Sequence, residues 1–167
     1  MTPHKIPHRL SARANAFNWL LRLTAKPAIY FFDDHPTALK AFDTVYSQAC
    51  TLLQINHTPK AIRTYTEKLT HCEGEWVMAK GVSADKVIYY LHGGAYFLSS
   101  PKLHRSITWR LSSFNRRCVF ALDYRVAPEH DITHCLEDAV EGYQHLLNSG
   151  FKPENIIIAG DSAGGHL

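Results

Sequence analysis

The chain has 167 residues, of which 46% are hydrophobic, and this is enough for one domain with a buried core. Its 18 Lys and Arg residues against 15 Asp and Glu residues give a formal net charge of +3. The basic residues are spread along the chain and do not form a patch interleaved with aromatic residues, which argues against a nucleic-acid partner.

The cysteines and the most apolar N-terminal stretch bear on the location of the protein. The cysteines form neither CxxC pairs nor the dense spacing of a disulfide framework, so reduced thiols are predicted. They are Cys50, Cys72, Cys118 and Cys135. The stretch 17–32 contains Arg22 and Lys26, so we expect no membrane span, and it has no convincing signal-peptide cleavage site. A cytoplasmic protein is expected.

Two different patterns precede residue 86. Residues 1–60 carry apolar positions at helical spacing in places, which predicts short helices forming an N-terminal cap segment. Their apolar side chains could line an acyl pocket or pack the cap on the core. In residues 62–81 two apolar stretches are interrupted at 72–75, which predicts an antiparallel hairpin. We place the main domain at 61–167.

Three continuous apolar runs follow, at residues 87–91, 118–122 and 156–159. Runs without alternation are typical of strands buried on both faces. Helical spacing fills both intervals, and right-handed crossovers would make the strands parallel and adjacent. The sequence therefore predicts an α/β fold whose functional loops lie at the carboxyl ends of the strands.

Each of the two intervening helices has a predicted apolar face. In the first interval Ser100 is placed to cap the helix, with Pro101 in the first turn. Gly150 ends the second helix. The first face consists of Leu103, Ile107, Leu111 and Phe114, and the second of Leu136, Ala139, Val140, Tyr143 and Leu147.

The third strand runs directly into Gly160-Asp161-Ser162-Ala163-Gly164, the G-x-S-x-G pattern of a nucleophile elbow. A serine on such a tight strand-to-helix turn adopts a strained backbone that exposes its hydroxyl. Ser162 is therefore the candidate nucleophile. Asp161 is interpreted as a side chain that stabilises the elbow, and His166 is expected to point away from the serine.

The first strand ends in His92-Gly93-Gly94-Ala95, which matches an HGGG-type oxyanion loop. Backbone amides of such a loop turn toward a developing oxyanion. We expect the amides of Gly93, Gly94 and Ala163 to form the oxyanion hole. His92 and Ala95 are expected to support the loop, His92 as a structural residue and not as a proton carrier.

These motifs, together with residues 123–130 (Asp-Tyr-Arg-Val-Ala-Pro-Glu-His) and 136–139 (Leu-Glu-Asp-Ala), resemble the hormone-sensitive-lipase-like, or fold-3, family of α/β-hydrolases. The resemblance covers about residues 75–167 and implies an α/β-hydrolase fold with N-terminal cap helices. It implies a carboxylic-ester hydrolase with Ser, Asp and His in that order. Ala95 departs from the third glycine of the commonest motif.

In the resembled family the triad acid and base would follow Leu167, so we expect a chain truncated after the elbow and inactive alone. The predicted function is a serine esterase that acts through an acyl-enzyme on small-molecule esters, with no cofactor and no metal. The alternative is a non-catalytic ligand-binding or vestigial protein of the same fold. The sequence leaves the acyl and alcohol specificity and the oligomeric state open.

Overall fold

The computed structural model describes Trp19, residues 36–52 and residues 57–167. The chain divides into two compact units, residues 1–39 and residues 40–167. Of the predicted N-terminal helices, α2 (Pro36–Leu52) is formed, whereas the stretch 17–32 lies outside the described residues except for Trp19. None of the described helices combines the length and the apolar character needed to cross a membrane. The division into a cap segment and a main domain stays a prediction.

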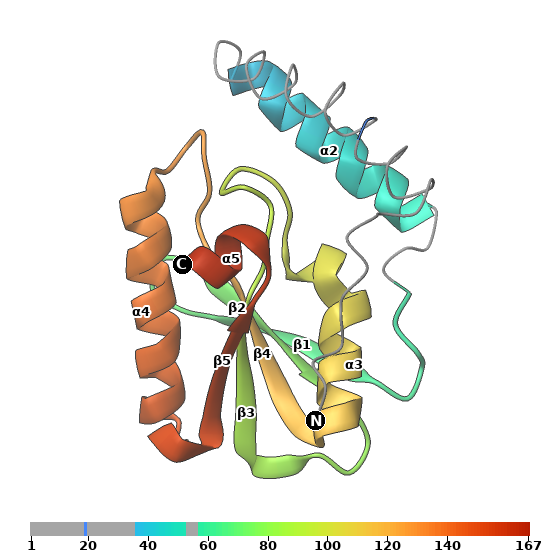
Figure 1. Cartoon of the computed structure of the whole chain (residues 1–167), viewed down its shortest axis with the longest axis vertical. Helices are drawn as coiled ribbons and strands as arrows, with labels where there is room; N and C mark the ends of the chain where they lie inside the picture. Colours follow the sequence, from blue (N-terminus) through green and yellow to red (C-terminus); the bar gives the residue numbers. More distant parts are fainter. Residues whose placement is uncertain (1–18, 20–35, 53–56) are drawn as a thin grey trace, which may run out of the picture. The chain divides into compact units, whose positions relative to one another are not determined.

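Five strands form one sheet in the second unit, in the order β1-β2-β4-β3-β5 (Figure 1). The strands are β1 (Arg63–Lys68), β2 (Glu73–Met78), β3 (Ser83–Leu91), β4 (Arg117–Asp123) and β5 (Ile156–Gly160). The helices that join or follow them are α3 (Arg105–Asn115), α4 (Ile132–Asn148) and α5 (Ser162–His166), with short 3-10 turns at Pro101–His104 and Pro153–Asn155. β3 pairs in parallel with both β4 and β5, which confirms the three predicted adjacent parallel strands.

The predicted hairpin is formed by β1 and β2, but its turn is displaced from the expected position. Residues 73–75 belong to β2, and the turn is closed by the Leu69 amide donating to the Cys72 carbonyl at 3.0 Å. Gly74 is needed in the strand because a Cβ there would lie 2.1 Å from the Phe120 ring. Glu75 can be buried because Arg105 donates to its carboxylate from Nε, at 3.0 Å to Oε2, and from the terminal nitrogen Nη2.

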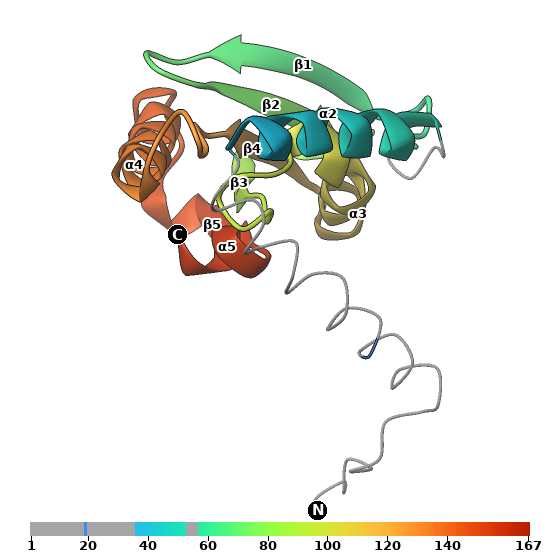
Figure 2. The same ribbon diagram turned by 90° about the horizontal axis from the view of Figure 1, so that it is seen from above.

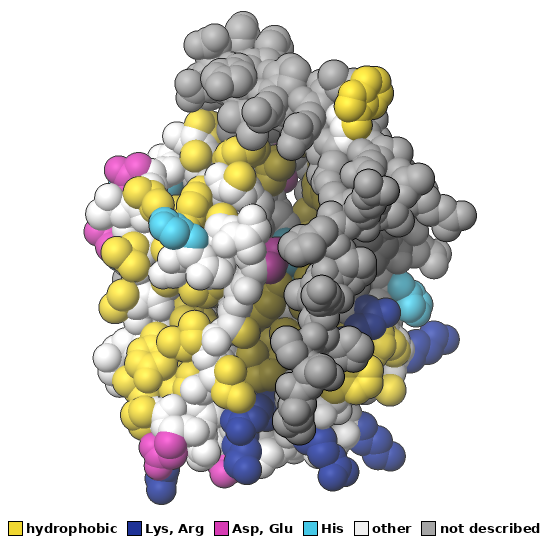
Figure 3. All heavy atoms as spheres, viewed as in Figure 1, with side chains coloured by type: hydrophobic (Ala, Val, Ile, Leu, Met, Phe, Trp, Pro, Cys, Tyr) yellow, Lys and Arg dark blue, Asp and Glu magenta, His cyan; other side chains and the backbone are white. Residues whose placement is uncertain are grey.

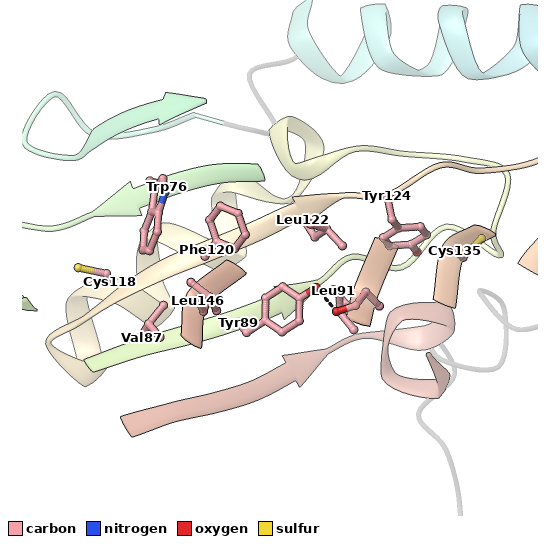
Figure 4. Packing of buried hydrophobic residues seen from close by; sticks show 11 residues of the cluster. Trp76, Val87, Tyr89, Leu91, Cys118, Phe120, Leu122, Tyr124, Cys135 and Leu146 are labelled. Carbon is pink, nitrogen blue, oxygen red and sulfur yellow. Dashed lines mark hydrogen bonds between the residues drawn. The ribbon is translucent and has the colours of Figure 1, made fainter. Parts of the chain in front are cut away.

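Alternate residues of the central strands build two cores, one on each face of the sheet. α4 and α3 lie on opposite sides of β3 and β4 (Figure 2). The larger core includes Tyr89, Phe120 and Leu146, and the Tyr89 hydroxyl donates to the carbonyl of Ala139 in α4 at 2.8 Å (Figure 4). The smaller core contains Val77, Ile88, Tyr90, Val119 and Ala121, with Trp109 and Leu111 of α3 packed against it.

The predicted buried faces of α3 and α4 are wrong in part. In each helix a polar side chain that is hydrogen-bonded to a residue outside the helix is buried, and some of the predicted apolar residues are exposed. In α4 the residues Leu136 and Val140 are 51% and 62% exposed, whereas Asp138 is fully buried and accepts hydrogen bonds from Arg125. In α3 the exposed fraction of Phe114 is 80%, whereas Ser112 is buried and donates to the Arg117 carbonyl.

Two further expectations need correction at the ends of these elements. Ser100 occupies the position before the 3-10 turn at Pro101–His104, but its side chain forms no capping hydrogen bond. β5 is not buried on both faces: Ile157 is 44% and Ile158 62% exposed, because β5 is an edge of the described sheet. Apolar side chains gather on the face built by α4 and β5 (Figure 3).

Candidate functional site: a nucleophile elbow beside an oxyanion loop

The elbow and the oxyanion loop leave neighbouring strands at the same edge of the sheet. β3 and β5 are parallel, and Leu91 at the end of β3 is paired with Gly160 at the end of β5. The loop that begins at His92 and the turn that begins at Asp161 therefore start side by side, as the parallel topology predicts.

Ser162 has the strained backbone expected of a nucleophile. Its φ of +48° lies in the left-handed region, which non-glycine residues seldom adopt. Asp161 is still extended, and α5 begins at Ser162. Such a conformation persists only where the surrounding structure enforces it, and it is found at functional sites more often than elsewhere.

Close backbone contacts enforce this turn. A Cβ at Gly164 would lie 2.1 Å from the carbonyl oxygen of Leu91 and 2.6 Å from that of His92. A Cβ at Gly160 would lie 2.5 Å from the Gly164 carbonyl oxygen. Both glycines of the motif are therefore required by the close packing of the turn on the end of β3.

The Asp161 carboxylate joins the elbow to the oxyanion loop, in agreement with its interpretation as a stabilising side chain. Its Oδ1 accepts a hydrogen bond from the Tyr90 hydroxyl at 2.6 Å and another from the Gly93 amide at 2.9 Å. Burial alone would raise the pKa of Asp161, but these hydrogen bonds outweigh burial and lower the pKa. The carboxylate is thus held in its ionised form.

The expectation that Gly93 supplies an oxyanion donor needs correction. An amide has a single proton, and that of Gly93 is already directed at Asp161. The Gly94, Ala95 and Ala163 amides, in contrast, donate to no other residue within the described ranges. Ala163 lies in the first turn of α5, where backbone amides have no partner inside the helix.

His92 is a buried and neutral residue at the start of the oxyanion loop. It is 1% exposed, and its ring stacks on Tyr124 with centroids 4.3 Å apart and an interplanar angle of 11°. Nδ1 lies 2.9 Å from the Gly93 carbonyl oxygen, which fixes the proton on Nδ1. Burial lowers the pKa of His92 to about 4. The Tyr124 hydroxyl donates to the His92 carbonyl at 2.6 Å and holds the backbone of the loop.

The loop after His92 turns through three strained or glycine positions. Gly94 has a φ of +134°, and a Cβ there would lie 1.9 Å from the Leu98 carbonyl oxygen. Ala95 and Tyr96 follow with φ of +54° and +68°. Ala95 therefore takes the left-handed conformation that a third glycine would adopt without strain.

Tyr96 forms a second connection between the loop and the elbow. Its hydroxyl lies 3.0 Å from the Ala163 carbonyl oxygen and 2.6 Å from Nδ1 of His166. His166 is thus engaged by Tyr96 and not by Ser162. The sequence carries no local signal for the contacts of Tyr90, Tyr96 and His104, since their partners lie 57 to 71 residues further along the chain.

A metal site is not supported at the cluster of possible ligands that the described residues contain. Donor atoms of Cys72, Asp138 and Glu141 lie within 4.8 Å of one another. Asp138 is occupied by Arg125, however, and burial next to Asp138 raises the pKa of Cys72 to about 12, which keeps the thiol protonated.

Residues 88–167 match the family model described as alpha/beta hydrolase fold, so this part of the chain has that fold. Carboxylesterase/phospholipase LipF of Mycobacterium tuberculosis is 41% identical over 110 residues, which are 64% of this chain and 29% of that protein. An esterase of Acinetobacter venetianus is 37% identical over 132 residues, 79% of this chain and 41% of that protein.

A solved structure described as an esterase from the bacterial hormone-sensitive lipase family superposes with a TM-score of 0.66 at 36% identity, covering 69% of this chain and 39% of that one. Residues 88–167 thus have the α/β-hydrolase fold, and these similarities agree with the resemblance to the hormone-sensitive-lipase-like family that the motifs predicted. It spans well under half the length of these relatives.

Proposed function

We propose that the chain carries the nucleophile and oxyanion loop of a serine carboxylic-ester hydrolase that acts on small-molecule esters through an acyl-enzyme. One observation supports this above the others. Ser162 has a left-handed backbone at the start of a helix. It lies beside the oxyanion loop, in which the amides of Gly94 and Ala95 donate no hydrogen bond to any described residue. The named relatives are a carboxylesterase/phospholipase and an esterase, and one solved relative is described as soaked with p-nitrophenyl butyrate.

In this proposal the Ser162 oxygen attacks the ester carbonyl carbon, and the carbonyl oxygen becomes an oxyanion. The Gly94 and Ala163 amides donate to that oxygen, with Ala95 the next candidate in place of Gly93. The alcohol then leaves with a proton, and water releases the acid from the acyl-serine. The resemblance assigns proton transfer to a His and an Asp that would follow Leu167.

No step of this reaction calls for a metal or an organic cofactor. We also propose a cytoplasmic location, which the free thiols of Cys72, Cys118 and Cys135 support.

Loss of the base costs about a millionfold in turnover in one serine protease, so residues 1–167 alone should have little or no esterase activity.

The proposal is tested with a chimera that joins residues 1–167 to the segment of the Acinetobacter venetianus esterase that follows its aligned elbow. We expect the chimera to hydrolyse p-nitrophenyl butyrate, and both its Ser162→Ala variant and the chain alone to be inactive. Turnover that survives Ser162→Ala would contradict the proposal. A folded chimera that binds the ester without turning it over would favour the non-catalytic alternative.

A further inference from the structure

His104 connects the far end of the oxyanion loop to the elbow. It ends the 3-10 turn at Pro101–His104, and its side chain is 14% exposed. Nε2 lies 3.5 Å from Asp161 Oδ2. On the other side of the ring, Nδ1 lies 3.2 Å from both the Ser99 hydroxyl and the Ser100 carbonyl oxygen.

The two oxygens of Asp161 therefore serve the two ends of one loop. Oδ1 accepts from the amide of Gly93, where the loop begins, and Oδ2 faces His104, which contacts Ser99, where the loop ends. Ser99 has a φ of +88°, a conformation that needs support from neighbouring groups. The histidine is the neighbour that provides a polar contact to its side chain.

We propose that His104 is a positioning residue for the oxyanion hole, which holds the end of the loop at Ser99 to the residue that precedes the nucleophile. The inference rests on the proposed function of Ser162. The Nε2 proton is directed at the Asp161 carboxylate, and Nδ1 faces the Ser99 hydroxyl and the Ser100 carbonyl oxygen. A proton on Nδ1 alone would direct the Nε2 lone pair at the full negative charge of Asp161, which is less favourable than an Nδ1 lone pair beside the neutral Ser100 carbonyl.

The packing around the ring restricts His104 to this position. The ring centroids of Tyr90 and His92 lie 6.1 and 5.6 Å from that of His104. Tyr90 also donates to Asp161, so the same aromatic side chain flanks the histidine and fixes its partner. The amides of Gly94 and Ala95, which donate to no described residue, lie between the two ends of the loop. Their direction depends on the contact of Gly93 with Asp161 at one end and on the contact of Ser99 with His104 at the other.

The first test is the protonation of the ring nitrogens, read from ¹⁵N chemical shifts of His104 in residues 1–167. A proton on Nε2, in the neutral tautomer or in the imidazolium, is the expected result. A neutral ring with its proton on Nδ1 alone would overturn the proposal. This measurement needs no variant, so it remains decisive if a substituted chain fails to fold.

The second test is amide hydrogen exchange of Gly93, Phe97 and Leu98, whose amides are hydrogen-bonded in the loop. His104→Leu should accelerate their exchange about tenfold, the effect of losing one hydrogen bond, with β3 and β4 unchanged. His104→Gln, which keeps a donor and an acceptor, should stay within about threefold of the parent.

His145→Leu is the matched control, because His145 is also a largely buried histidine but lies in α4 and contacts Glu67. It should leave the exchange of the loop unchanged. Unaltered loop exchange in His104→Leu, or equal acceleration in His145→Leu, would overturn the proposal. Neither test uses turnover, so a failure of this inference is distinguishable from a failure of the proposed function, which the chimera tests.

Discussion

The close approach of α5 to the end of β3 predicts opposite effects for the same substitution at two consecutive glycines. A Cβ at Gly164 would lie 2.1 Å from the Leu91 carbonyl oxygen, whereas a Cβ at Gly165 would find its nearest atom, the Gly160 carbonyl oxygen, at 3.4 Å. The neighbour in both cases is backbone, which has no rotamer to change. Gly164→Ala must therefore move the turn away from the strand, and Gly165→Ala needs only a slight adjustment.

The magnitudes follow from these distances. Relief of the overlap at Gly164 requires a backbone shift of roughly 1 Å, and overpacking of this kind costs about 1–3 kcal/mol. Gly165 is exposed in the same helix, where alanine gains up to about 1 kcal/mol over glycine. The free energies of unfolding of the two variants should differ by about 2 kcal/mol or more, with Gly164→Ala the less stable.

Urea unfolding measures this difference, followed by tryptophan fluorescence, to which Trp76, 5% exposed in the folded chain, contributes. Gly165→Ala serves as the control, since it makes the same chemical change one residue away. Equal unfolding midpoints, or a Gly164→Ala variant as stable as the parent, would refute the claim that the elbow is packed against the backbone of β3.

Two further predictions concern buried charges. Burial, reinforced by Glu73, raises the pKa of Asp123 to about 7. The folded chain then keeps a proton that the unfolded chain releases above about pH 4, so this contribution to stability declines as pH rises from about 4 to 7. Between pH 5 and pH 8 the free energy of unfolding of the parent should therefore fall by about 2 kcal/mol from this group, allowing for its partial exposure. Asp123→Asn should remove that fall, and an unchanged difference between the two pH values would contradict the prediction. Arg105→Met should cost about 3 kcal/mol or more, because it leaves the buried Glu75 carboxylate unpaired. Adding Glu75→Met should recover most of that loss, and failure to recover it would show that the pair is not the cause.

The sheet and the two loops of the site were predictable because each depends on neighbouring residues in the sequence. The unalternating apolar runs at 87–91 and 118–122 identify strands with a core on both faces. The glycines around Ser162 identify a turn that needs space and a left-handed backbone. Such local requirements are visible without knowledge of the fold.

The helix faces and the hydrogen-bonded groups of the site were not predictable, because each depends on contacts distant in sequence. Asp138 is buried in α4 only because Arg125 neutralises it. The Gly93 amide is unavailable to an oxyanion because a carboxylate 68 residues further along the chain accepts its proton. Counting apolar residues gives no information about either partner.

The most direct test of the central claim is the covalent acyl-enzyme. The chimera is mixed rapidly with p-nitrophenyl butyrate, quenched in acid and digested, and the peptide that contains Ser162 is examined by mass spectrometry. We expect a butyryl group on Ser162 that disappears in Ser162→Ala and accumulates more slowly in Asp161→Ala. A butyryl group on another residue of the hydrolytic chimera, or ester hydrolysis with no acyl-serine at any quench time, would contradict it.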